Sequence, residues 1–136
     1  MPAFTAGFAG AVSMDNASDV LTAIKSYVNS VSLTINGQTY DVSVLGDVWQ
    51  QFVAGQKGAT VSINYFIDPT IDAIMFAAIA AIKSLTFDPQ GTGTGTSHYA
   101  AEMIGTSIAP SAPVNGAATS TFSATVTGTV TRTTNA

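Results

Sequence analysis

Few side chains in this 136-residue sequence could act as acids, bases or nucleophiles. His98 is the single histidine, and the absence of cysteine excludes a thiolate nucleophile, a disulfide and a cysteine-ligated metal. A general base needs an orienting partner and a nearby nucleophile, and no sequence signature around His98 supplies either. We therefore expect no catalytic residue, and we interpret His98 as an ordinary surface or core histidine.

A cluster of oxygen-bearing side chains, Asp15, Asn16 and Asp19, could in principle ligate calcium. A calcium-binding loop of the EF-hand type needs glycine at its sixth position and glutamate at its twelfth. Counted from Asp15, those positions are Val20 and Ser26. The cluster therefore predicts a polar turn with local side chain-to-backbone hydrogen bonds, and we expect no metal.

A glycine-rich run, Gly91, Gly93 and Gly95, follows a predicted strand. The dinucleotide-binding fingerprint is G-x-G-x-x-G and opens a helix, whereas this run leads into a second predicted strand and is followed by no P-loop lysine. The run predicts a flexible connection, and we expect no cofactor.

The composition excludes further classes of protein. Only 9% of the residues are charged, against about 25% in an average soluble domain. Four Lys and Arg residues cannot neutralise many phosphates, which excludes a conventional nucleic-acid binder. A hydrophobic content of 46% excludes a disordered chain. With 19 Thr and 13 Ser, the surface is expected to be rich in hydroxyls and suited to packing against copies of itself.

The sequence shows no targeting or membrane-spanning segment. Its first ten residues lack the basic region and apolar core of a signal peptide. The most apolar stretch, residues 71–82, is shorter than the roughly 20 residues that a membrane span needs. We therefore expect a soluble protein made in the cytosol, with no membrane partner.

The first half of the chain predicts strands around one hairpin. Residues 1–8 predict an extended arm, and Ala9–Met14 predicts a short strand. Val20–Val28 fits either a strand or a helix, and its β-branched residues favour a strand. Residues 28–45 predict a β-hairpin that turns at Asn36-Gly37, since both residues tolerate positive φ. Residues 46–58, which include Trp49, predict a long loop.

The second half predicts one helix and several more strands. Asp68 as N-cap and Pro69 at the first helical position, followed by an apolar stripe, predict a helix over residues 68–83. Strands are expected at Ala59–Ile67, Ser84–Asp88, His98–Ile108 and Thr119–Thr133. The last strand is long and alternates between an apolar face and a Thr-rich face, so we expect it to be paired, either within the chain or with another subunit. The sequence as a whole predicts one domain over residues 1–136.

Several segments, taken in order, resemble a known family. They are Ser30-Val31-Ser32-Leu33, Tyr40–Asp47, Phe52–Ile63, Leu85–Gly91 and Phe122–Arg132. In this order they are similar to the tail tube proteins, and related small virion proteins, of tailed bacteriophages. The resemblance covers roughly residues 28 to 133, and it rests on the succession of segments instead of on one specific motif.

This resemblance implies a mainly β fold, a β-sandwich or half-barrel with one flanking helix, that completes a β-barrel within a ring. It implies a structural, non-enzymatic role in the virion tail: hexameric rings stack into a tube through which DNA leaves without tight binding, alongside other tail proteins. Aromatic residues dominate interface energetics, so we expect assembly contacts in the N-terminal segment 1–8 and in the 46–58 loop. The expected contact residues are Phe4, Phe8, Trp49, Gln50, Gln51 and Phe52.

Three other functions remain open from the sequence. A head decoration or head–tail connector protein could share the fold. A carbohydrate-binding β-sandwich module would be a monomer with exposed aromatic residues around a groove. A small hydrolase would require the base and the nucleophile that the sequence lacks.

Overall fold

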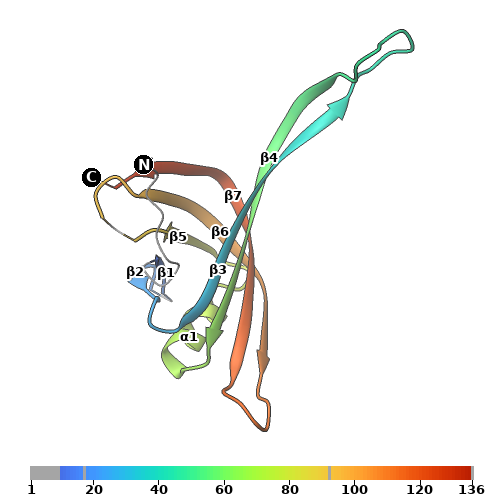
Figure 1. Cartoon of the computed structure of the whole chain (residues 1–136). Helices are drawn as coiled ribbons and strands as arrows, with labels where there is room; N and C mark the ends of the chain where they lie inside the picture. The colour runs from blue at the N-terminus through green and yellow to red at the C-terminus, as the bar shows by residue number, and fades with distance from the viewer. Residues whose placement is uncertain (1–9, 17, 92, 136) are drawn as a thin grey trace.

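The computed structural model describes residues 10–16, 18–91 and 93–135, which form a seven-stranded antiparallel sheet with one helix (Figure 1). The order of strands across the sheet is β2-β1-β5-β6-β7-β4-β3. In chain order the elements are β1 (Ala11–Asp15), β2 (Leu21–Ala23), β3 (Val28–Asp41), β4 (Phe52–Phe66), α1 (Pro69–Ala77), β5 (Ile82–Asp88), β6 (Ser97–Ser111) and β7 (Thr119–Thr134).

The predicted class, mainly β with one flanking helix, is confirmed. The described strands belong to one continuous curved sheet, so the half-barrel describes the arrangement better than two separately hydrogen-bonded sheets (Figure 1). The predicted arm, residues 1–8, lies outside the described residues.

The core lies on the inner face of the curved sheet and is closed at one end by α1. Alternate residues of β4 point inward, and Val61, Ile63 and Tyr65 are fully or almost fully buried. Phe122 on β7 and Met103 on β6 meet them in the same cluster. Each such side chain contributes roughly 1.5–3 kcal/mol when it is removed from water. The period-two pattern of the sequence thus determines which face of each strand is buried.

The helix begins as predicted but ends earlier. The Asp68 carboxylate accepts a hydrogen bond from the Thr70 N–H at 2.9 Å, and α1 ends at Ala77 instead of extending to residue 83. The chain then turns through Ala80, at a φ of 58°, and from Ile82 onward it pairs with β6. The prediction of a helix over 68–83 is wrong at its carboxyl end, because pairing within the sheet overrides the apolar stripe.

The predicted hairpin turn is also wrong. Asn36 and Gly37 lie inside β3, opposite Gly58 and Lys57 of β4, and the chain reverses over residues 42–51. Residues 28–45 are therefore one strand and the start of a turn, and the predicted 46–58 loop contains the first residues of β4. The unbroken pairing from Val31↔Ile63 to Gly37↔Lys57 outweighs the local turn signal of Asn-Gly.

The remaining strands lie close to their predicted positions. The terminal strand is confirmed as Thr119–Thr134, and β5 and β6 contain the predicted segments. In the ambiguous segment Val20–Val28, only Leu21–Ala23 forms a separate strand before β3 begins. β7 has two more residues than β6 between the pairs Ala100↔Thr131 and Glu102↔Thr127, and Gly128 in this bulge has a φ of 83°.

Candidate assembly interface

The most unusual feature is a two-stranded hairpin that leaves the sheet. We call residues 35–59 the hairpin arm. β3 and β4 pair with each other from Ile35↔Ala59 to Asp41↔Phe52, whereas the pairing of β4 with β7 stops at Thr60↔Thr125. Beyond that point the arm projects away from the body of the subunit (Figure 1). An isolated hairpin is only marginally stable in water, so the arm has the form of an element that a partner completes.

The arm has a defined conformation along its length. Its register shifts by one residue between Gly37↔Lys57 and Thr39↔Ala54. Near this bulge, a Cβ atom on Gly55 would lie only 2.5 Å from the ring of Tyr40, so glycine leaves the space that the ring occupies. The Tyr40 hydroxyl donates to Gln38 Oε1 at 3.0 Å.

The tip of the arm, residues 42–51, is held by its own hydrogen bonds. The Val42 N–H donates to the Gln51 carbonyl at 2.9 Å, and the Gln51 N–H donates to Ser43 Oγ at 2.7 Å. The Ser43 N–H donates to the Asp41 carboxylate, and this bond, followed by the Ser43 hydroxyl, lowers the pKa of Asp41. The Val44 N–H donates to Asp47 Oδ2 at 2.8 Å. Such bonds hold the tip in one shape before any partner binds it.

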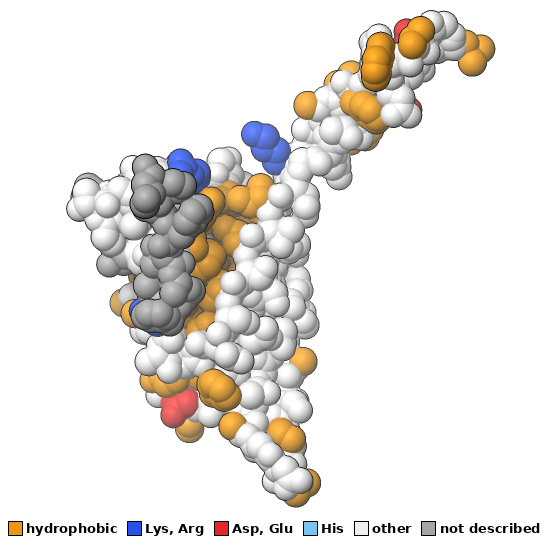
Figure 2. Space-filling model, in the orientation of Figure 1, with side chains coloured by type: hydrophobic (Ala, Val, Ile, Leu, Met, Phe, Trp, Pro, Cys, Tyr) orange, Lys and Arg blue, Asp and Glu red, His pale blue; other side chains and the backbone are white. Residues whose placement is uncertain are grey.

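Large apolar side chains are exposed along the arm (Figure 2). At the tip, the exposed fractions are 103% for Leu45, 92% for Val48 and 83% for Trp49. Further exposed apolar side chains of the arm are Ile35, Tyr40, Val42, Val44, Phe52 and Val53. Many exposed apolar side chains on one projecting element are typical of a protein–protein contact.

The predicted contact residues divide into two groups. Trp49, Gln50, Gln51 and Phe52 are all exposed and lie together at the tip and at the start of β4. Phe4 and Phe8 lie outside the described residues. The sequence prediction omitted Val44 and Leu45, which it placed at the end of the 28–45 hairpin, and Val48, whose apolar character within the predicted 46–58 loop was a usable signal.

The strand edges offer a second kind of contact. β3 lies at one edge of the sheet and β2 at the other. The pairing of β4 with β7 ends at Thr60↔Thr125, where the hairpin arm leaves the sheet. The part of β4 before Thr60 and the part of β7 after Thr125 therefore each have a free edge where they would face each other. Free edges of this kind can pair with another copy of the chain, and two different edges on one subunit allow head-to-tail rings.

The only histidine belongs to a structural network. His98 Nδ1 lies 2.6 Å from Asp88 Oδ1, and the same oxygen accepts a hydrogen bond from Asn135 Nδ2 at 3.1 Å. Asn135 Nδ2 also donates to Thr96 Oγ1, and the Gly95 N–H donates to the Asn135 carbonyl. These bonds fasten the end of β7 to the glycine-rich connection, which accounts for His98 without catalysis.

The predicted polar turn around Asn16 is confirmed. Asn16 Oδ1 accepts hydrogen bonds from the N–H groups of Ser18 and Val20, at 2.8 and 3.1 Å.

The two carboxylates next to this turn have partners on β5. Asp19 pairs with the buried ammonium of Lys83 at 2.6 Å, and the Ser84 N–H donates to Asp15 Oδ2. These carboxylates thus bind groups of β5, and the described residues contain no cluster of metal-ligating side chains.

Within the described ranges, no helix has the length and apolar character needed to cross a membrane.

No protein-family model matches the sequence, and no curated protein matches it in sequence. Solved structures, in contrast, match the fold over nearly the whole chain. The tail of an empty gene transfer agent particle, refined with C6 symmetry, superposes with a TM-score of 0.75 at 18% identity and covers 96% of this chain and 99% of that chain. The SPP1 tail tube has a TM-score of 0.79 at 9% identity, with coverage of 96% and 80%.

A third match comes from a protein that ends a tube. The anti-feeding prophage cap, which is a tube-terminating cap, has a TM-score of 0.72 at 17% identity and covers 98% of this chain and 93% of that chain. Each of these three matches covers at least 96% of this chain. The chain has the fold of tail tube and tube-terminating proteins.

Proposed function

We propose that this chain is a structural, non-catalytic subunit of a virion tail tube. Six copies form a ring, and rings stack into a tube through which DNA passes. The fold supports this proposal, and so does the C6 symmetry of the gene transfer agent tail. The single observation that carries the proposal is the projecting arm, whose apolar tip has no partner among the described residues of its own chain.

The arm is the proposed contact between copies. Trp49 and Leu45 extend into solvent at the tip, and burying one aromatic side chain removes about 150–250 Å² from water. Phe52 lies at the base of the tip, and Gln50 and Gln51 provide polar groups next to the apolar ones. This combination of apolar centre and polar rim is the usual anatomy of an interface. Phe4 and Phe8 stay a prediction from the sequence.

The charge distribution is compatible with the passage of DNA. Of the four cations, Lys83 is buried and paired, which leaves Lys25, Lys57 and Arg132 exposed against a net charge of −4. A tube lined by such subunits would not hold phosphates tightly, because phosphate contacts supply most non-specific affinity. Location in the virion tail, synthesis in the host cytoplasm and contact with other tail proteins follow from the same proposal.

A tube-terminating protein is the second candidate, favoured by the match to the anti-feeding prophage cap over 98% of this chain. Tube subunits polymerise without limit, whereas a terminator forms single rings. Electron microscopy of the concentrated, purified chain, together with its mass in solution, tests both. Stacked rings support the tube; isolated rings support the terminator; a stable monomer that binds glycans contradicts both.

A further inference from the structure

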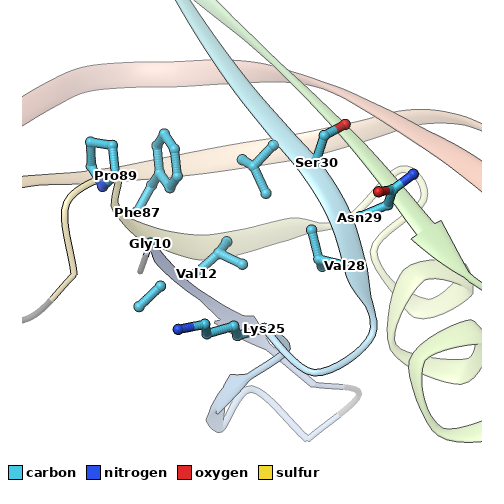
Figure 3. Close-up of a pocket in the computed structure, with 10 residues that line it drawn as sticks. Gly10, Val12, Lys25, Val28, Asn29, Ser30, Phe87 and Pro89 are labelled. Atoms are coloured by element: carbon cyan, nitrogen blue, oxygen red, sulfur yellow. The ribbon is translucent and has the colours of Figure 1, made fainter. Parts of the chain in front are cut away.

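An apolar groove lies between β3 and β5, and residues next to and within β1 form its floor (Figure 3). Its first lobe has a volume of about 570 Å³, and Gly10, Val12, Val28, Val31, Phe87 and Pro89 line it. Its second lobe, of about 290 Å³, shares Phe87 and Pro89 and continues to Leu33, Ile35 and Tyr99. We call the two together the β3–β5 groove.

The groove is an incomplete part of the core. Val28, Val31, Leu33 and Phe87 pack against the buried cluster with one side and remain partly exposed on the other. A second layer of apolar atoms over them would remove further surface from water, worth about 25 cal/mol for each Å². Among the described residues that line the two lobes, Lys25 is the one charged side chain.

The position of Gly10 indicates which segment supplies this layer. Gly10 is the first described residue, and it lines the first lobe. The nine residues before it, MPAFTAGFA, carry no charged side chain and contain two phenylalanines. A segment tethered at the groove has a high effective concentration there, which no separate partner shares.

The spacing of the phenylalanines matches the two lobes. In an extended segment, Phe4 and Phe8 lie on the same side, about 13 Å apart at 3.3 Å per residue. Phe8 is then about 7 Å from Gly10, within reach of the first lobe, and Phe4 falls beyond it along the groove. We propose that the β3–β5 groove is the docking site for the chain's own residues 1–9, with Phe8 in the first lobe and Phe4 in the second. This gives both phenylalanines a site within the subunit, in place of a contact between subunits.

A tryptophan reporter tests this docking. In a Trp49→Phe background, Phe8→Trp places the only indole of the chain at the proposed site. We expect blue-shifted emission and weak quenching by acrylamide at every protein concentration, including dilutions at which the mass in solution is that of a single chain. Emission typical of an exposed indole, or burial that disappears on dilution, would overturn the proposal, since the second result assigns the segment to a neighbouring copy.

A matched pair of groove variants locates the site. Val31→Asn places an amide in the first lobe and should shift the reporter emission toward that of exposed tryptophan, whereas Val114→Asn, at a position 99% exposed between β6 and β7, should not. Circular dichroism verifies that both variants fold. An unchanged reporter in folded Val31→Asn would place the segment elsewhere and overturn the proposal.

A second measurement avoids any change to the apolar lining. Because the chain has no cysteine, Lys25→Cys, at an exposed position lining the first lobe, provides a unique attachment point for a nitroxide quencher. The label should quench the reporter within a single chain, and unquenched emission would overturn the proposal. The assembly measured by microscopy is a separate readout, so failure of this docking is distinguishable from failure of the proposed function.

Discussion

Gly105 and Ala78 lie in direct backbone contact, at the place where the segment after α1 meets β6. The Gly105 N–H donates to the Ala78 carbonyl at 3.1 Å, and the Ala80 N–H donates to the Gly105 carbonyl at 2.9 Å. A Cβ atom on Gly105 would lie 2.5 Å from the Ala78 oxygen and 3.0 Å from the ring of Phe122. The absence of a side chain at residue 105 therefore allows α1 to close the end of the core.

Gly105→Ala is expected to destabilise the subunit by about 1–3 kcal/mol, because backbone atoms must move apart and core packing is disturbed. The measurement is the free energy of unfolding in urea. Gly58→Ala is the matched control, since a Cβ at Gly58 meets nothing within 4 Å. Equal stability of the two variants would show that the contact is not tight.

Tyr65→Phe is expected to stabilise the subunit by about 1 kcal/mol at neutral pH. Tyr65 is fully buried, and neither its hydroxyl nor that of Ser120 has a hydrogen-bond partner among the described residues. Removing an unpaired buried hydroxyl while keeping the ring removes a desolvation cost. A clear loss of stability on this substitution would show that the hydroxyl is bonded.

The same tyrosine predicts sensitivity to alkali. Burial raises the pKa of Tyr65, and the Ser120 hydroxyl lies close enough to lower it in part, although its geometry falls short of a hydrogen bond. The folded state thus keeps a proton that the unfolded chain loses near pH 10. The free energy of unfolding that depends on protonated Tyr65 is fully present below pH 10, and it decreases as the pH rises through the higher pKa of the folded state. Unfolding free energies measured from pH 8 to 11 should fall less steeply for Tyr65→Phe; parallel curves would contradict this.

Asp88→Asn is expected to loosen the end of β7. The substitution removes the charge next to His98 and weakens the bond from Asn135, which together contribute about 1–2 kcal/mol. Hydrogen exchange at the Gly95 and Asn135 amides, both bonded in this network, should accelerate. Glu102→Gln, an exposed charge change on β6, should leave these amides unaffected. Unaltered exchange in Asp88→Asn would mean that backbone pairing alone holds this end.

The sequence predicted best where local pattern and tertiary pairing agree. Alternation located β7, because each inward residue up to Ala124 meets the same core. It failed at Asn36-Gly37, where a favourable turn dipeptide is held extended by the pairing of β3 with β4. It failed again after Ala77, where Lys83 pairs with Met103 of β6 instead of continuing the helix. Both errors arise from long-range pairing, which local periodicity does not contain.

The candidate site was only partly predictable. Trp49 and Phe52 were expected at contacts because they are aromatic, and both are exposed. The sequence did not indicate the arm itself, since its existence depends on β7 parting from β4 at Thr125. The groove beside Phe87 was equally hidden, because residues of β1, β3 and β5 line it together.

Trp49→Ala is expected to weaken assembly by a factor of about 30, equivalent to roughly 2 kcal/mol for each contact, as for an aromatic interface residue. The stability of the single chain should change little, because the Trp49 side chain is 83% exposed there. Sedimentation velocity over a concentration series measures the assembly. Phe76→Ala, an exposed aromatic change on α1, is the control and should assemble normally. Normal assembly of Trp49→Ala would remove the tip from the proposed interface.

The symmetry of the assembled protein tests the central proposal most directly. Cryo-electron microscopy of the purified, concentrated chain should show tubes of stacked rings with sixfold symmetry, as in the gene transfer agent tail. In a reconstruction, the hairpin arm of one subunit should be buried against another copy, with Trp49 in the contact. A chain that stays monomeric at high concentration, or tubes in which the arm remains in solvent, would contradict the account.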